Sequence, residues 1–119
     1  MKLLQIEKIL IFWTLVIFMA VAWPLPENTI VSQISYSDKI VHVILFGLFA
    51  SLLCGALIKH NSVKHYYFVS WIGAAGYAAV AELIQVFIPG RTCSVYDFLA
   101  GSLGALVFLL VFYVYHKKR

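Results

Sequence analysis

The chain has 119 residues, of which 63% are apolar and 12% are charged, and its formal net charge is +4. A soluble domain has about 45–50% apolar and about 25% charged residues, and a core of this size could not bury so much apolar surface in water. These proportions exclude a soluble globular protein and indicate a membrane protein with one domain over residues 1–119.

The basic residues and the two cysteines exclude further classes of protein. Lys and Arg stand singly between long apolar runs, apart from a cluster at the C-terminus, so they form no phosphate-binding face for nucleic acid. Cys54 and Cys93 lie in neither a CxxC spacing nor a Cys/His ligand spacing. The sequence therefore predicts no nucleic-acid partner, no zinc module and no disulfide framework.

Apolar runs at residues 9–23, 40–58, 66–88 and 98–115 are separated by charges and turn residues. As helices they would be about 22, 28, 34 and 27 Å long, against a hydrocarbon core of about 30 Å. The first is long enough only if it begins near residue 5, with Lys8 reaching the headgroups. We therefore predict an all-α, four-helix transmembrane bundle with helices at about 5–23, 40–58, 66–88 and 98–115.

The N-terminal run has a second interpretation, as a secretory signal peptide. Lys2 gives a positive start, residues 10–21 are apolar, and Ala20-Val21-Ala22 is a small-x-small cleavage pattern. However, Trp23-Pro24 directly after this pattern is a poor cleavage context, and cleavage would leave only three helices. We favour a retained first helix.

The unequal distribution of Lys and Arg predicts the orientation of the bundle, because cytoplasmic loops carry an excess of basic residues. The side that holds both termini has seven basic residues, and the other side has only Lys39 and Arg91. The seven are Lys2, Lys8, Lys59, Lys64, Lys117, Lys118 and Arg119. We expect both termini in the bacterial cytoplasm and the loops at 24–38 and 89–97 outside the cell.

Most ionisable groups that do not serve as cytoplasmic anchors lie at the outer ends of three predicted helices or in the loop beside them. A charged group in a membrane helix is costly and usually faces the bundle interior or a water-filled cavity, so a functional site is expected. Asp38 and His42 are spaced i and i+4 and share one helix face. The candidate site residues are Asp38, Lys39, His42, Glu82, Gln85, Arg91 and Asp97.

Stripes of small residues run from these polar positions along the same three helices. Small side chains let membrane helices approach closely, so the second, third and fourth helices should pack together. This packing is expected to bring His42, Glu82 and Asp97 together and to leave the first helix peripheral. The stripes are Gly47, Ser51 and Gly55, then Ser70, Ala74 and Ala78, then Gly101, Gly104 and Ala105.

The polar residues also form an ordered set of motifs between about residues 38 and 104. The motifs are Asp38-Lys39-x-x-His42, Glu82-x-x-Gln85 with Pro89-x-Arg91, and Asp97 at the head of a glycine-containing last helix. This set resembles the VanZ-like family of small bacterial membrane proteins. The resemblance implies a cytoplasmic-membrane location and a phenotype, low-level teicoplanin resistance, rather than a reaction. One departure is Gly101, where family members often have Asn.

The first functional hypothesis is a binding protein whose outer polar cleft engages an envelope lipid or a cell-wall component. Arg91 would hold a phosphate or carboxylate through charge-assisted hydrogen bonds. Asp38, Lys39, Gln85 and Asp97 would complete the ligand-binding set. Membrane lipid is the expected partner, no cofactor or resident metal is assigned, and a homo-oligomer is left open.

The second hypothesis is a membrane-embedded hydrolase or transferase that acts on an envelope lipid or a peptidoglycan precursor. Glu82 and His42 would be its catalytic acid–base pair, and Arg91 would stabilise developing negative charge. A metal variant would hold zinc or manganese with His42 and neighbouring acids. No nucleophile motif is present.

Two other interpretations use the same residues. Glu82 and His42 could relay protons in a carrier. Four short helices are few for alternating access, and the polar groups lie at one end, so this interpretation requires a dimer. In a purely structural interpretation, Asp97 is a first-turn acid, Arg91 anchors lipid headgroups and His42 is the polar partner of Glu82.

Overall fold

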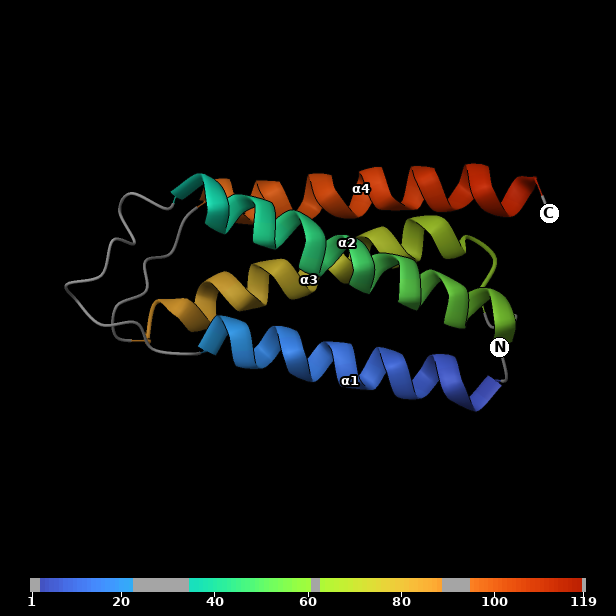
Figure 1. Ribbon diagram of the computed structural model, residues 1–119, viewed down its shortest axis with the longest axis horizontal. Helices are drawn as coiled ribbons and strands as arrows, with labels where there is room; N and C mark the ends of the chain where they lie inside the picture. The colour runs from blue at the N-terminus through green and yellow to red at the C-terminus, as the bar shows by residue number, and fades with distance from the viewer. Residues whose placement is uncertain (1–2, 23–34, 61–62, 89–94, 119) are drawn as a thin grey trace.

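The computed structural model describes residues 3–22, 35–60, 63–88 and 95–118, without the side chains of residues 3–4 and 35–38. These residues form four α-helices and no strand: α1 (Leu3–Ala22), α2 (Ser35–His60), α3 (Tyr66–Gln85) and α4 (Val95–Lys117). The helices run up and down alternately, so that α1 begins and α4 ends at the same end of the bundle (Figure 1). All four are long and apolar enough to cross a membrane, which confirms the predicted all-α membrane bundle.

The helices α2 and α4 begin before their apolar runs, at Ser35 rather than residue 40 and at Val95 rather than residue 98. Apolar composition marks only the part of a helix that can lie in hydrocarbon, whereas the first turn tolerates polar residues. An acid there also interacts favourably with the positive end of the helix dipole. Asp97 is such a first-turn acid in α4, as the structural interpretation of this residue predicts.

The helix α3 ends at Gln85, before the predicted residue 88. Beyond it, the backbone N–H groups of Phe87 and Ile88 donate to the carbonyls of Ile84 and Gln85, three residues back. Such tighter bonds are common where an α-helix ends. The physical reason is Pro89, because a proline disfavours helical geometry in the residue before it.

The closest packing in the bundle is between α2 and α4, and it depends on glycine. A Cβ atom on Gly104 would lie 2.6 Å from the Cα atom and 2.7 Å from the carbonyl oxygen of Val43, so this position has room only for hydrogen. One turn further along both helices, Gly47 of α2 packs against the ring of Phe108. These contacts confirm the expected packing of α2 against α4 through small residues.

The inward face of α3 is the predicted small-residue stripe. Its buried residues are Ser70, Ala74, Ala78, Ala81, Glu82 and Gln85. Between this face and α4 lies Phe46 of α2, which is fully buried and makes an edge-on contact with Tyr77 at 5.7 Å between ring centroids. The second, third and fourth helices thus share one core, as predicted.

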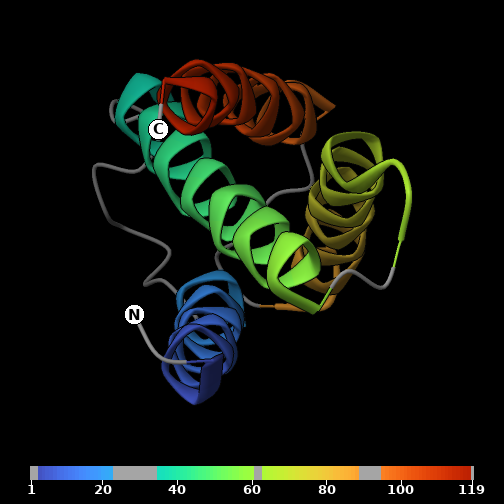
Figure 2. The same ribbon diagram turned by 90° about the vertical axis from the view of Figure 1, so that its right-hand side faces the viewer.

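The helix α1 is peripheral, as predicted, and lies on the side of α2 opposite to α4 (Figure 2). Two side chains nevertheless fix it to the bundle. The indole N–H of Trp13 donates to the carbonyl of Leu45 at 2.9 Å, and the Tyr77 hydroxyl donates to the carbonyl of Thr14 at 2.7 Å. These two bonds connect the peripheral helix to α2 and to α3.

At the end of the bundle where α1 begins, Nε2 of His60 contacts Oε1 of Glu7. The His60 side chain is exposed at this end of the bundle and is paired with the Glu7 carboxylate. The pairing arises because the start of α1 lies beside the end of α2 (Figure 1).

The close approach of α2 and α4 predicts that Gly104→Ala destabilises the protein. The added methyl group would press on the backbone of Val43, and overpacking of this kind costs about 1–3 kcal/mol of unfolding free energy. The measurement is denaturant unfolding of the detergent-purified protein. Gly76→Ala is the matched control, because a Cβ there meets nothing within 4 Å. Equal stability of the two variants would contradict this account of the interface.

Candidate functional site

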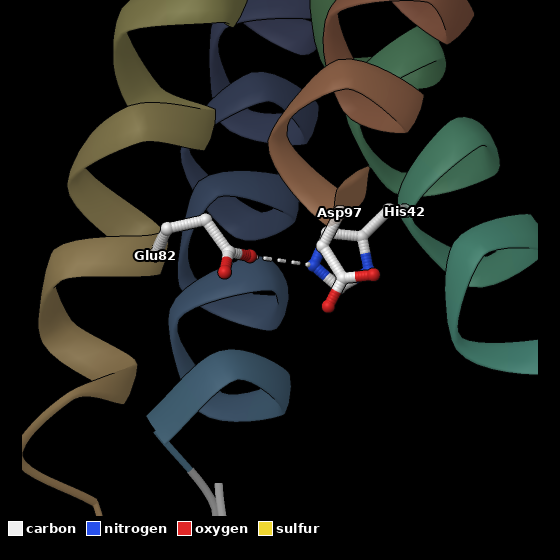
Figure 3. Close-up of side chains that lie close together, drawn as sticks. All are labelled: His42, Glu82 and Asp97. Atoms are coloured by element: carbon white, nitrogen blue, oxygen red, sulfur yellow. Dashed lines mark ion pairs between the residues drawn. The ribbon is translucent and has the colours of Figure 1, made fainter. Parts of the chain in front are cut away.

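Three ionisable side chains from three helices meet inside the bundle: His42 of α2, Glu82 of α3 and Asp97 of α4 (Figure 3). Each offers one nitrogen or oxygen atom, and these three atoms lie within 4.8 Å of one another. The side chains are only 4%, 6% and 7% exposed, respectively. The site lies at the end of the bundle opposite to the start of α1 and the end of α4 (Figure 1).

The helix packing positions these three groups. Gly104 of α4 touches Val43, the residue after His42, and Asp97 lies two turns before Gly104 on the same side of α4. Glu82 continues the buried stripe of α3, one turn after Ala78. The small faces that let the helices approach therefore also bring the polar groups to a common point.

An aromatic ring closes the site toward the middle of the bundle. Phe46 lies one turn after His42 on α2, with the two ring centroids 5.9 Å apart. A Cβ on Gly101 would lie 3.0 Å from the Phe46 ring and 3.3 Å from the Cβ of Ala78. A larger side chain at position 101 would therefore displace Phe46 or Ala78. This packing gives a physical reason for glycine where the VanZ-like pattern often has Asn.

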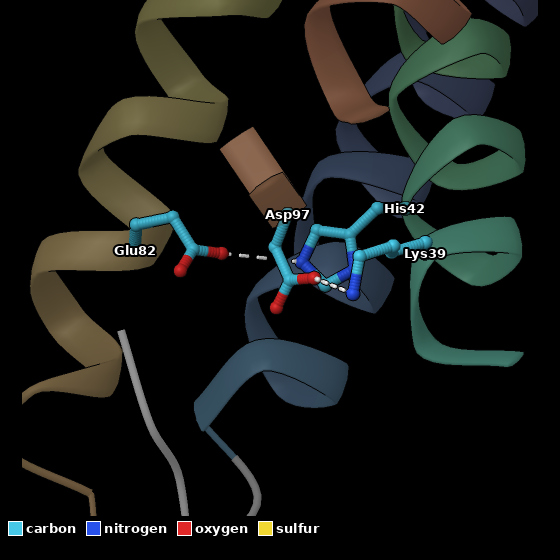
Figure 4. A network of polar contacts seen from close by, with 4 residues as sticks. All are labelled: Lys39, His42, Glu82 and Asp97. Carbon is cyan, nitrogen blue, oxygen red and sulfur yellow. Dashed lines mark ion pairs between the residues drawn. The ribbon is translucent and has the colours of Figure 1, made fainter. Parts of the chain in front are cut away.

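Each carboxylate of the site faces a basic group. His42 Nε2 lies 3.3 Å from Glu82 Oε1, and Lys39 Nζ lies 3.8 Å from Asp97 Oδ1 (Figure 4). Burying an isolated carboxylate costs much free energy unless a cation, a proton or hydrogen bonds compensate it. The Lys39 side chain is 34% exposed and so connects the buried groups to the surface.

The other residues predicted for the site fall into two groups. Gln85 is 2% exposed and lies on the buried face of α3 within one turn of Glu82. Asp38 belongs to the first turn of α2, but its side chain lies outside the described residues, as does the whole of Arg91. The structure thus brings together His42, Glu82, Asp97 and Lys39, while the functional role of every site residue remains a prediction.

Phe46 is a site residue that the sequence analysis missed. The available signal was its position four residues after His42, which puts the two side chains on one face of the helix. In an apolar membrane helix this signal is weak, because most neighbours of any polar residue are large and apolar.

The fold and site together define a small multi-pass membrane-type helical bundle with a buried polar cluster at one end. The chain matches the model of the VanZ/LLP1 family over residues 2–116 and belongs to this family. The match extends well beyond the motifs at 38–104 and includes α1. Comparisons with curated proteins and with solved structures find no match.

The buried pair predicts a strong energetic coupling between His42 and Glu82. In a double-mutant cycle with His42→Gln and Glu82→Gln, we expect a coupling of about 1–3 kcal/mol in unfolding free energy, because the pair is screened from water. The exposed pair of His60 and Glu7 is the matched control and should give about 0.2–1 kcal/mol. A buried pair no more strongly coupled than the exposed one would argue against the geometry of the site.

Proposed function

We propose that this protein binds the phosphate-bearing headgroup of an envelope lipid or lipid-linked cell-wall component at its polar cluster. The observation that carries the proposal is the burial of His42, Glu82 and Asp97 at one point, at the end of an otherwise apolar bundle. Polar groups in this position oppose folding in a membrane and are usually retained for function. No other cluster of three such side chains occurs among the described residues.

The location of the cluster favours a lipid as ligand. The outward surfaces of the helices are covered with large apolar side chains that suit acyl chains, while the cluster lies within about two turns of three helix ends, where we propose that a headgroup enters. Lys39 is positioned at the rim, and its ammonium group suits a phosphate oxygen through a charge-assisted hydrogen bond. Arg91 is proposed as a second phosphate contact, and Asp38 and Gln85 as polar contacts that orient the ligand.

The proposed location is the outer leaflet of a bacterial cytoplasmic membrane. Lys59, Lys64 and Lys117 all lie at the bundle end opposite to the cluster. Because basic residues concentrate on the cytoplasmic side, this end is proposed to face the cytoplasm and the cluster to face outside. A ligand of this kind on the outer leaflet is consistent with a family named for teicoplanin resistance, and we propose a corresponding effect on teicoplanin susceptibility.

A second candidate function is favoured by the 3.3 Å separation of His42 Nε2 and Glu82 Oε1. A buried imidazole and carboxyl within reach of each other suit general acid–base catalysis. In this alternative the protein is a hydrolase or transferase acting on the same headgroup. Incubation with a polyprenyl diphosphate and measurement of inorganic phosphate separates the two functions. Multiple turnover that Glu82→Gln abolishes would establish catalysis and contradict binding without turnover.

The binding function predicts a preference for a charged headgroup that depends on Lys39. The full-length protein in detergent should bind a long-chain polyprenyl phosphate more tightly than the uncharged polyprenol, as measured by native mass spectrometry. Lys39→Gln should weaken binding of the phosphate at least about tenfold, because a hydrogen bond to a charged group contributes about 1.5–3 kcal/mol. Binding of the polyprenol should not change.

The matched control is Lys64→Gln, which removes an equal charge from an exposed residue at the other end of the bundle. This variant should bind the phosphate like the unchanged protein. Equal binding of phosphate and polyprenol, or equal losses from the two lysine variants, would overturn the proposed headgroup site.

A further inference from the structure

We infer that His42, Glu82 and Asp97 bind a divalent metal ion of the zinc or manganese class. The donor set is one imidazole and two carboxylates, and mixed nitrogen and oxygen ligands of this type suit these metals. All three side chains are more than nine-tenths buried and come from three different helices. Ligands on packed helices are held more rigidly than ligands on loops, which favours a defined coordination geometry.

The distance between the donor atoms of His42 and Glu82 fits tetrahedral coordination of a metal ion. With metal–ligand bonds of about 2.0–2.2 Å, two ligand atoms of a tetrahedral site lie about 3.3–3.6 Å apart. His42 Nε2 and Glu82 Oε1 are 3.3 Å apart, which meets this requirement. The three donor atoms lie within 4.8 Å of one another, so side-chain shifts of about 1 Å would bring them to the separations of a tetrahedral site. Three protein ligands leave the fourth position for water or a ligand atom.

The residues around the three donors have the properties of an outer coordination shell. Lys39 contacts Asp97 from the rim and would orient that carboxylate. Phe46 packs beside the His42 ring and limits both its rotation and the access of water. These contacts hold two of the three donors in place.

A bound metal ion would increase the attraction of the site for a phosphate. This step rests on the proposed function. Without a metal, the two carboxylates oppose the approach of a phosphate, and the attraction comes from Lys39 at the edge of the site. A divalent ion bound to neutral His42 gives the four residues and the ion a net charge of +1. A phosphate oxygen could then occupy the fourth position, with Lys39 as its neighbour. Metal binding itself does not depend on the identity of the lipid.

The first test uses the unchanged full-length protein, so it does not depend on any variant folding. After treatment with a chelator, the detergent-purified protein is titrated with Co²⁺, whose visible absorption reports coordination by protein ligands. We expect saturation at one Co²⁺ per chain and displacement of the absorption by Zn²⁺. No saturable Co²⁺ spectrum, together with no change of the unfolding midpoint in Zn²⁺ or Mn²⁺, would overturn the inference.

The second test assigns the ligands. His42→Gln and Asp97→Asn should each weaken Zn²⁺ binding at least about tenfold in calorimetric titrations, since even the loss of outer-shell partners has effects of this size. His60→Gln is the matched control, because His60 also pairs with a glutamate but has only that one acid as partner in the described residues. Unchanged Zn²⁺ binding in His42→Gln, or an equal loss in His60→Gln, would overturn the assignment.

Different experimental results would contradict the lipid proposal and the metal proposal. Polyprenyl phosphate binding in a protein that binds neither Co²⁺ nor Zn²⁺ would contradict the metal inference and leave the proposed function intact. Stoichiometric Zn²⁺ binding in a protein that binds no polyprenyl phosphate would support the metal site and contradict the proposed function.

Discussion

The contact between Gly104 of α4 and the backbone of Val43 in α2 is the constraint on which the site depends. A Cβ at position 104 would lie 2.6 Å from the Val43 Cα atom, so the two helices approach as closely as backbones allow. Val43 directly follows His42, and Asp97 lies two turns before Gly104. The close approach therefore holds an imidazole and a carboxylate, on separate helices, near each other. The small residues on the buried face of α3 let this helix pack closely, so that Glu82 lies at the same point.

This arrangement has opposing energetic effects. In a membrane, the hydrophobic effect does not drive helices together, because the lipid around them is apolar too. Dispersion contacts between closely packed small residues stabilise the association instead. The convergence of two buried carboxylates opposes this association, and the basic partners His42 and Lys39 offset part of the cost. An apolar set of side chains could join the same helices without this cost. This cost is the reason for which we propose a ligand-binding role for the polar cluster.

Much of the fold could be predicted from the sequence, because the apolar runs and small-residue stripes are local patterns. The stripe through Ala74 and Ala78 identified the buried face of α3, and with it the direction of Glu82. The contacts of α1 could not be predicted in this way. The bond from Trp13 to Leu45 and the pair of His60 with Glu7 depend on how a helix without a stripe docks, which its own residues do not specify. The starts of α2 and α4 differ from the prediction because apolar composition does not mark polar first turns.

The most direct test of the account is whether His42 and Glu82 meet inside the bundle in a lipid bilayer. Solid-state NMR of protein with ¹⁵N-labelled histidine and ¹³Cδ-labelled glutamate detects such a pair through its dipolar coupling. Glu7→Gln in the background removes the second His–Glu pair of the described residues, which is formed with His60. The contact between His42 and Glu82 predicts a clear ¹⁵N–¹³C coupling in this background. The coupling should disappear when Glu82→Gln is added. Absence of this coupling before Glu82→Gln is added would contradict the described site, because the site requires His42 and Glu82 to be neighbours.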